Sequence, residues 1–459
     1  MIPKRPINAD VPTPEPETQQ LEPVEKEAPE KKSESRWRQA EEEPKRSEPT
    51  PPREPKPLAP KLLAALAALA VVFIVVAIVF SGGGKNESSN EGAAAPRPAA
   101  PGKPDEAPVS QTPEALGYPS FATNNTTRIG GSDPAANAAA VALAVFPSTT
   151  PAQRPTAVTL VNEEDWAGAI AASVLMAAPV RAPILFSRPD ELPEASEEAL
   201  DALDFQGGKA TGGAAFFAIG TVSLPGGARA TRVDSGDPAS TAAQIATLRD
   251  RLFGKPPAAI LIASSSSPDF AMPAAAWAAR SGDPVLYADA KKLPAATAAV
   301  LSEHPKTPVF VLGPSGAVSA AALKEIEKLS KRVKRVAGND PAANAIALAR
   351  LHDGSFGWNV NDPGHGFVLA RSDSPADAAA AAPLSASGTW GPLLLTEGAG
   401  TLPDAVRNYL LDVKPGYTTD PTRAFYNRFW LIGDQDAIGV GQQAEVNELA
   451  ELAKIGGEP

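Results

Sequence analysis

The feature that most constrains this chain is a short pattern that occurs three times, beginning at Arg128, Arg232 and Arg335. Each copy couples an arginine after a short strand to an Asp-Pro pair that opens an Ala-rich run. Aspartate accepts hydrogen bonds from the free N–H groups of a first helical turn, and proline at the first helical position loses nothing by lacking its own. The pattern therefore predicts a strand-to-helix junction, used once in each of three units of small-domain size.

Composition excludes several classes of function. The chain has no cysteine, which rules out thiolate metal sites, thiol nucleophiles and disulfides. Its 53 acidic residues outnumber its 42 basic ones, for a net charge of −11. Nucleic acid is therefore not expected as a partner, because binding phosphates needs a concentrated basic surface.

The first part of the chain predicts a membrane anchor between two unstructured segments. Residues 1–57 are rich in Pro, Glu and Lys and are predicted to be a disordered cytoplasmic tail, a possible contact for a cytoplasmic partner. Leu62–Phe80 is an unbroken apolar run long enough for one transmembrane helix, which we place within 58–81. Basic residues are denser before the span than after it, which predicts a cytoplasmic N-terminus and an extracellular C-terminal part. Residues 82–117 have the Gly, Pro and Ala content of a flexible linker.

Beyond residue 118, short apolar strands alternate with helical patterns, which is typical of a parallel α/β fold. We divide this part into repeats at 118–226, 227–330 and 331–459. Helices are expected, for example, at 165–177, 273–279 and 320–329. Besides a strand near Arg128, the strands are expected at 157–161, 183–186, 216–219, 258–262, 285–287, 309–312, 366–370, 393–396 and 429–432.

The three units resemble the cell-wall-binding repeat 2 family, which occurs in tandem triplets in surface proteins of Gram-positive bacteria. The closing motif of that family, Val-Leu-Gly-Gly-x-x-Ala-Val-Ser, is similar to 311–319 and more loosely to 431–438, and the middle strand is similar to 182–185. The repeated Arg and Asp residues match the opening motif. The resemblance implies three Rossmann- or toprim-like α/β repeats around a pseudo-threefold axis, attached without covalent bonds to an anionic wall polymer.

The chain also departs from the family pattern. Pro134, Pro238 and Pro341 stand where the family usually has arginine, and the middle-motif aspartate is kept only at Asp377. Gly168 and Met272 take its place in the first and second units. The first unit also passes from Gly220 to Arg232 with little room for a closing helix. These departures make the inheritance of the fold better supported than the inheritance of the ligand.

Each repeated polar residue allows two interpretations. Asp133, Asp237 and Asp340 are assigned as architectural helix N-caps, the commoner role for Asp before Pro, with ligand contact as the alternative. Arg128, Arg232 and Arg335 could pair with carboxylates of the chain, or their planar guanidinium groups could bind phosphate or uronate of a wall polymer. We predict ligand contact for these three arginines and for Asp377.

Other chemical features favour structural roles. Trp166, Phe270, Trp390 and Trp430 could stack on sugar rings, but Trp166 and Phe270 occupy equivalent places in a helical apolar pattern, which favours packing. A basic run from Lys324 to Arg335 could meet a polyanion or be a solvated face. The three histidines share no metal-ligand spacing, and no hydrolase or nucleotide-binding motif is present, so neither catalysis nor a cofactor is expected.

The sequence therefore predicts a membrane-anchored, non-catalytic protein that binds an anionic polysaccharide of the cell wall through three weak sites acting together. The alternative is an envelope scaffold that contacts proteins and has lost glycan binding. A weaker third possibility is an envelope hydrolase or its modifying subunit.

Overall fold

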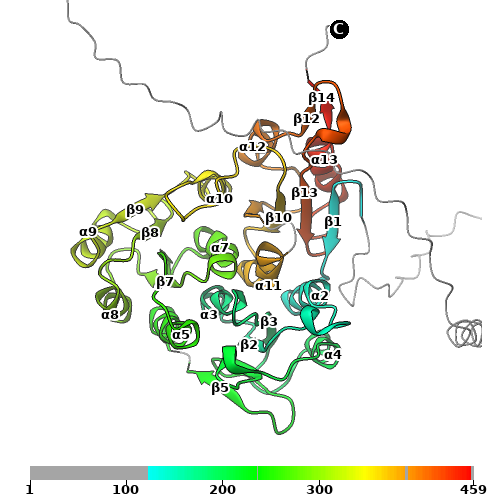
Figure 1. The fold of residues 1–459 in the computed structure, drawn as a ribbon. Coiled ribbons are helices and arrows are strands. Elements are labelled where there is room, and N and C mark those ends of the chain that lie inside the picture. The colour runs from blue at the N-terminus through cyan, green and yellow to red at the C-terminus, as the bar shows by residue number, and fades with distance from the viewer. Residues whose placement is uncertain (1–121, 235, 388–390, 456–459) are drawn as a thin grey trace, which may run out of the picture. The chain divides into compact units, whose positions relative to one another are not determined.

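A computed structural model describes residues 122–234, 236–387 and 391–455. In this part of the chain three four-stranded sheets lie around a group of central helices (Figure 1). Within each sheet all neighbouring strands are parallel. In spatial order the first sheet contains β3 (Ile184–Ser187), β2 (Val158–Asn162), β4 (Phe216–Ile219) and β5 (Ala230–Val233). The second contains β7 (Val285–Ala288), β6 (Ile260–Ser264), β8 (Val309–Leu312) and β9 (Val333–Val336). The third contains β11 (Leu393–Thr396), β10 (Gly366–Arg371), β13 (Arg428–Ile432) and β1 (Thr126–Ile129).

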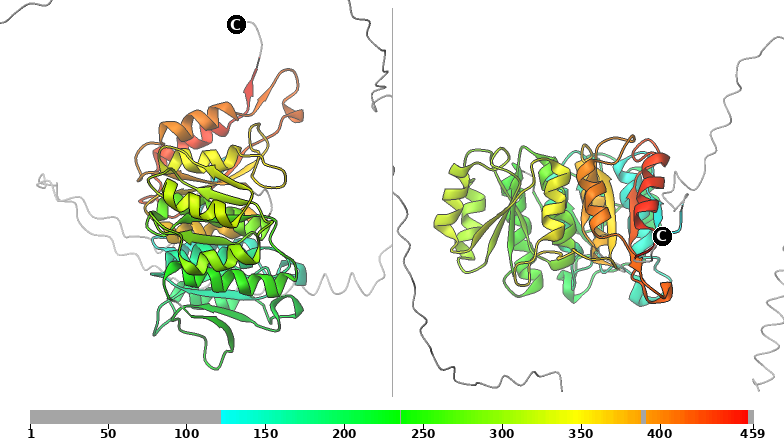
Figure 2. Two further views of the ribbon diagram at one scale, coloured as in Figure 1. Left: turned by 90° about the vertical axis from the view of Figure 1, so that its left-hand side faces the viewer. Right: turned by 90° about the horizontal axis from the view of Figure 1, so that it is seen from above.

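Helices connect most successive strands, β4 and β5 being an exception, and their axes lie roughly along the strands (Figure 2). A small additional sheet pairs β12 (Gly416–Tyr417) with β14 (Ala453–Lys454). The α-helices are α2 (Pro134–Val145), α3 (Trp166–Ala172), α4 (Glu194–Ala202), α5 (Pro238–Phe253), α6 (Pro268–Ala271), α7 (Pro273–Ser281), α8 (Ala295–Glu303), α9 (Ala320–Leu329), α10 (Pro341–Arg350), α11 (Pro375–Ala386), α12 (Asp404–Asp412) and α13 (Val440–Ala450). Short 3₁₀ turns lie at Pro151–Gln153, Ser173–Met176, Lys209–Thr211 and Pro421–Arg423.

The predicted parallel α/β class is confirmed, since each predicted strand range overlaps a strand and neighbouring strands of the three main sheets pair in parallel. The predicted helix at 165–177 is α-helical only as far as Ala172 and continues as a 3₁₀ turn. One local expectation was wrong. The repeated arginine lies inside its strand, not after it, at Arg128 in β1, Arg232 in β5 and Arg335 in β9.

The strand that carries each repeated arginine completes the sheet formed by the preceding unit. β5 pairs with β4, and β9 pairs with β8. β1, from the start of the described chain, pairs with β13 near its end. The three sheets are thus linked in a closed cycle, with the last sheet completed by the strand that comes first in sequence.

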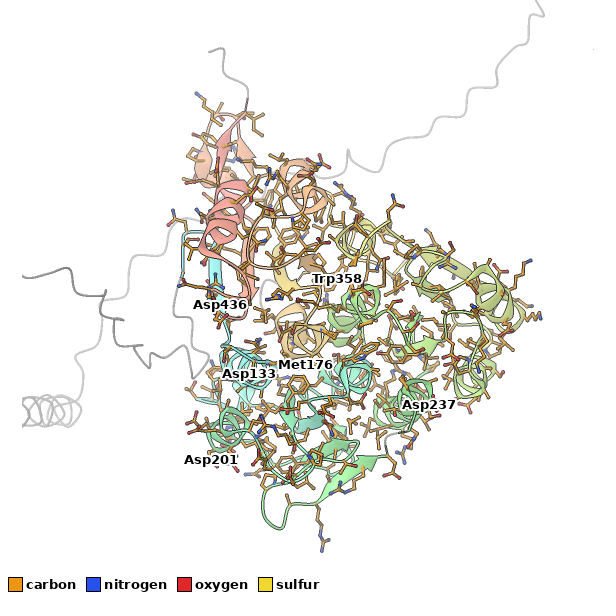
Figure 3. All side chains as sticks on the ribbon, turned by 180° about the vertical axis from the view of Figure 1, so that it is seen from behind. Asp133, Met176, Asp201, Asp237, Trp358 and Asp436 are labelled. Atoms are coloured by element: carbon orange, nitrogen blue, oxygen red, sulfur yellow. The ribbon has the colours of Figure 1, made fainter. Side chains whose placement is uncertain are left out.

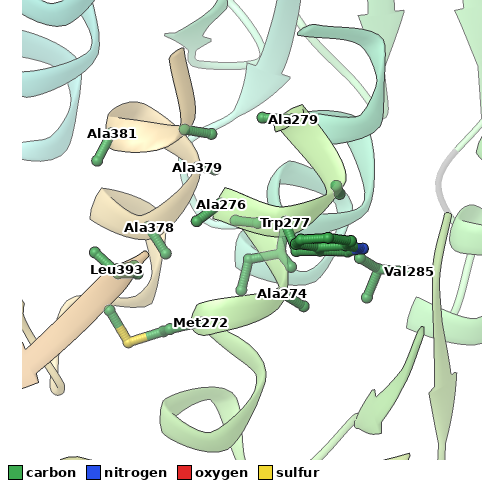
Figure 4. Packing of buried hydrophobic residues seen from close by; sticks show 14 of the residues in the cluster. Met272, Ala274, Ala276, Trp277, Ala279, Val285, Ala378, Ala379, Ala381 and Leu393 are labelled. Atoms are coloured by element: carbon green, nitrogen blue, oxygen red, sulfur yellow. The ribbon is translucent and has the colours of Figure 1, made fainter. Parts of the chain in front are cut away.

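Three Ala-rich helices fill the centre of this cycle. α3, α7 and α11 contact one another, and nearly all their side chains are buried. Alanine side chains of α7 and α11, among them Ala276 and Ala379, point toward one another (Figure 4). Small side chains let helix backbones approach closely, and each buried methylene or methyl group contributes about 0.8 kcal/mol. The Ala-rich runs of the sequence are therefore the core of the cycle.

None of the helices in the described ranges is long and apolar enough to span a membrane. The predicted transmembrane span, Leu62–Phe80, lies outside those residues, as do the predicted tail and linker.

Candidate functional site: the repeated arginine junctions

The three Asp-Pro pairs all begin helices, and the aspartate accepts hydrogen bonds from the first turn in each case. Asp133 Oδ1 lies 3.0 Å from the N–H of Ala136, and Asp340 Oδ1 lies 2.7 Å from that of Ala343. Asp237 accepts from the N–H groups of Ala239 and Ser240 and from the Ser240 hydroxyl. The Ser240 hydroxyl, together with these N–H groups, lowers the pKa of Asp237. Figure 3 marks Asp133 and Asp237 at two of the junctions.

The three arginines occupy one register position relative to the strand beside them. Arg128 pairs with Leu431, Arg232 with Ala218 and Arg335 with Val311. In each case the paired residue lies two positions before the glycine that ends its strand. Gly220, Gly313 and Gly433 all have positive φ, between 73° and 96°. Each arginine therefore lies at the same position relative to the end of the neighbouring strand.

At two of the junctions the guanidinium donates to that closing turn. Arg335 donates to the carbonyls of Gly313 and Val318, both at 2.6 Å. Arg128 donates to Gly433, Asp434 and Ile438 carbonyls at 2.6–3.1 Å and to Gln443 Oε1 at 2.8 Å. These charge-assisted bonds connect each of the two arginines to the turn that follows the neighbouring strand.

These contacts leave little of the two side chains for a ligand. Only 2 % of Arg128 is exposed, whereas Arg335 is half-buried and its burial lowers its pKa. The predicted ligand contact of Arg128 does not agree with this placement, because its guanidinium already faces four oxygen acceptors from the chain.

The third junction, at Arg232, lacks a closing helix. β4 is followed directly by β5, with no helix between them, as the short spacing from Gly220 to Arg232 predicted. The turn and helix that Arg335 and Arg128 contact therefore have no counterpart here. Arg232 is exposed.

Arg232 instead lines a groove of about 420 Å³ between β5, α5 and α8. Its apolar floor includes Val233, Leu248 and Val300. Its polar side chains are Arg232, Gln244, Thr247, Arg251 and Glu303. Two arginines and one glutamate leave an excess of positive charge, and planar guanidinium groups bind carboxylate or phosphate through two parallel bonds.

The sequence analysis did not predict the other groove residues. Gln244, Thr247 and Arg251 are spaced by three and four residues on α5, so they share one helix face. That spacing is the signal that could have revealed them, but it gains meaning only once α5 is known to lie beside Arg232.

Asp377 lies at the contact between the first and last units, not on the surface. It is 5 % exposed and accepts a 2.8 Å hydrogen bond from the amide of Asn137, whose oxygen accepts from the N–H of Gly131. Burial is the main cause that raises the pKa of Asp377. This placement, too, differs from the predicted ligand contact.

The other two junctions lack this carboxylate–amide pair. The amide of Asn344, the counterpart of Asn137, donates to the Phe270 carbonyl, and Met272 beside it is fully buried. In the remaining junction Thr241 replaces the asparagine, and its hydroxyl accepts from the N–H of Gly236. A carboxylate is thus present only where an amide from the neighbouring unit donates to it.

The remaining candidates divide between packing and solvent. Trp166 packs edge-on against buried Tyr287 at 5.8 Å, and Trp430 packs against the core. Trp390 lies outside the described residues. Lys324, Lys328 and Lys331 are exposed, and Arg332 and Lys334 pair with Asp353. In the described ranges no three His, Asp or Glu side chains form a group that could hold a metal.

Comparison with known proteins matches two parts of the chain to a family. The model of cell wall binding domain 2 (CWB2) matches residues 232–323 and 335–443. A comparison with curated protein sequences found no match.

Two solved structures share the fold. Cwp6 from Clostridium difficile has a TM-score of 0.55 and 20 % identity over 71 % of this chain and 47 % of its own. Cwp8 from Clostridium difficile has a TM-score of 0.55 and 19 % identity over 72 % of this chain and 52 % of its own. The chain thus spans about half the length of each. The solved structures show a shared fold, and the family model confirms the resemblance inferred from the repeated motifs over residues 232–323 and 335–443.

Proposed function

We propose that this protein attaches to the bacterial cell wall and acts by binding, without catalysing a reaction. The observation that carries the proposal is the match of two segments to cell wall binding domain 2. The first unit, in 118–226, supplies a sheet with the same strand order as the other two, and we propose that it is a third, divergent repeat.

We further propose that the ligand is an anionic wall glycopolymer and that the Arg232 groove binds one of its phosphate or carboxylate groups. Arg232 and Arg251 supply the charge, and the apolar floor excludes water from one side of the contact. Arg128, Arg335 and Asp377 then hold the units together and contact no polymer. This assignment retains one of the three arginines predicted from the sequence and gives the other two an architectural role.

The proposal includes attachment to the membrane through Leu62–Phe80, with 1–57 in the cytoplasm and the repeats outside. The hydropathy of that span and the charge bias around it support this topology. The protein would then connect membrane and wall.

Co-sedimentation of the purified full-length chain with isolated Gram-positive cell walls tests the proposal. Walls stripped of their anionic polymer serve as the second arm, and both arms are repeated across a salt series. We expect binding that is lost on stripping and weakens with salt, since exposed charge pairs are screened.

Variants test the groove in the same assay. Removing both groove arginines (R232A with R251A) should weaken wall binding by roughly a hundredfold or more, because each of the two charge-assisted contacts contributes about 1.5–3 kcal/mol. Arg229 is the matched control, because it is exposed in the segment leading to β5 but does not line the groove. An R229A variant as weak as the double variant would refute the groove. No binding to native walls would refute the function and favour the protein scaffold.

A further inference from the structure

The strand β1 differs from its two counterparts in how it is joined to the sheet that it completes. β5 follows β4 directly and β9 follows α9, so the chain itself connects each of these strands to its sheet. β1 lies at the edge of the third sheet beside β13 (Figure 1), and the residues in contact there, such as Arg128 and Gly433, are 305 positions apart. No local chain connection therefore holds β1 against β13.

The helix that follows β13 supplies side-chain contacts to this segment. Gln443 and Asn447 of α13 each form hydrogen bonds with two residues in or just before β1. The partners, at 2.7–3.1 Å, are Thr123, Asn125, Thr126 and Arg128. Gln443 is 1 % exposed, so its two bonds are shielded from water. Side chains of α13 thus bind β1 along its length.

The second unit shows that these contacts are not a general property of the fold. Leu323 and Glu327 of α9 lie as far beyond Gly313 as Gln443 and Asn447 lie beyond the corresponding glycine of the third unit. Leucine has no hydrogen-bonding side chain, and Glu327 is exposed. The polar contacts of α13 therefore occur at the junction where the chain does not connect the strand to its sheet.

β1 can also be separated from the rest of the fold. It pairs with one strand only, and Ile129 is the apolar side chain that it adds to the core. The chain then passes through Gly130, with φ 113°, into α2, which packs against α4, α11 and β3. Hydrogen bonds hold β1 more than apolar burial does, and its removal leaves the packing of α2 in place.

We propose that β1 is a clasp that closes the cycle of sheets and can leave the third sheet while the remaining fold persists. Local openings of this kind cost less free energy than global unfolding. The chain before β1 leads to the predicted span Leu62–Phe80, so tension between membrane and wall would act first on the clasp. This consequence for tension rests on the proposed membrane attachment.

Thiol labelling of the full-length chain tests the clasp, because the natural sequence has no cysteine. Ile129→Cys places a thiol on β1, and Val336→Cys places one at the equivalent, also buried, position of β9. Labelling rates that are proportional to reagent concentration report the opening equilibrium. At low urea the first thiol should react at a nearly constant rate and the second at a rate that rises steeply, since the urea dependence scales with the surface exposed.

Two substitutions sharpen this test. Asn447→Ala should speed labelling at Ile129→Cys roughly tenfold, because the clasp loses its bonds to α13. Ile262→Val, in the buried β6, should speed labelling at Val336→Cys roughly fivefold and leave Ile129→Cys unchanged, because the open state keeps the core of the second unit. Glu327→Ala is the matched control for Asn447→Ala and should alter neither rate.

The contrary results are equally definite. If both thiols share one urea dependence, or if Ile262→Val speeds both equally, then β1 leaves only when the whole protein unfolds and is no clasp.

Optical tweezers test the response to tension, with one handle at the N-terminus and the other at Lys328→Cys on the exposed face of α9. Release of 122–132 should appear as a first step of at most ~40 Å, from ~3.6 Å per residue, and at lower force in Asn447→Ala. A single unfolding step in both proteins would overturn the proposal. Neither measurement involves walls or a membrane, so its failure would leave the proposed attachment intact, and a failed co-sedimentation would leave the clasp intact.

Discussion

The Arg335 and Arg232 junctions share the same strand register, the same Asp-Pro helix start and the same preceding glycine, yet their arginines are in different environments. Arg335 contacts two carbonyls of the closing turn between β8 and α9. Arg232 has no such turn beside it and lines a groove. The absence of a helix between β4 and β5 thus leaves the arginine at this position exposed. The local motif is therefore insufficient to assign the role of its arginine.

The largest expected effect on stability is at the junction that contains Arg128, the most deeply buried of the three arginines. Arg128→Ala should lower the free energy of unfolding by about 3 kcal/mol or more, because four hydrogen bonds are lost, three of them buried, and β1 loses its side-chain contact with the turn and helix that follow β13. Urea denaturation followed by circular dichroism measures this, with R229A as a surface control. A loss no greater than that of the control would show that the closing turn does not need Arg128.

Arg335→Ala should have a smaller effect of the same sign, about 1–2 kcal/mol, since two carbonyls lose a donor and the site is only half-buried. The same denaturation series measures it. The R232A variant should thus be the most stable of the three, followed by R335A and then R128A. The opposite order would contradict the structural role of the closing turn that Arg335 and Arg128 contact.

The raised pKa of Asp377 predicts that the stability of the folded protein depends on pH. Its pKa is raised in the folded state, mainly by burial, so folded protein binds this proton more tightly than unfolded protein does. The contribution of Asp377 to the free energy of unfolding therefore becomes more favourable as pH falls from above its folded pKa toward the ordinary value of about 3.9.

Asp377→Asn removes this titration while keeping an oxygen to accept from Asn137. We expect the variant to melt at a higher temperature than wild type at pH 7, with the difference shrinking toward pH 4. Thermal melts across that range measure it. A constant difference at all pH values would mean that the Asp377 carboxyl does not titrate differently on folding.

The smallest expected effect on stability is at the open junction. Arg232→Ala should change the free energy of unfolding by no more than about 0.5 kcal/mol, as for other exposed side chains without structural contacts. Its effect should instead appear in wall co-sedimentation, which R335A should leave unchanged at temperatures where it is folded. A destabilisation of R232A equal to that of R335A would contradict the difference between the two junctions.

Much of the fold could be predicted from local sequence. Apolar runs such as 309–312 are too short and too continuous for anything but buried parallel strands, and Asp before Pro accounts for the starts of α2, α5 and α10. The spacing after Gly220 also predicted the absence of a closing helix. These properties depend on a few neighbouring residues, so they could be recognised without knowing the fold.

The roles of the site residues could not be predicted in the same way, because they depend on residues far apart in sequence. Asp377 accepts a hydrogen bond from Asn137 of the first unit. Trp358, on the loop between α10 and β10, packs against Trp277 on α7. The sequence by itself determined the strands, the helix starts and the resemblance to cell wall binding domain 2. The tertiary structure alone decided which arginine meets solvent, because the oxygen acceptors that occupy Arg128 come from more than 300 residues away and those that occupy Arg335 come from a turn that the first unit lacks.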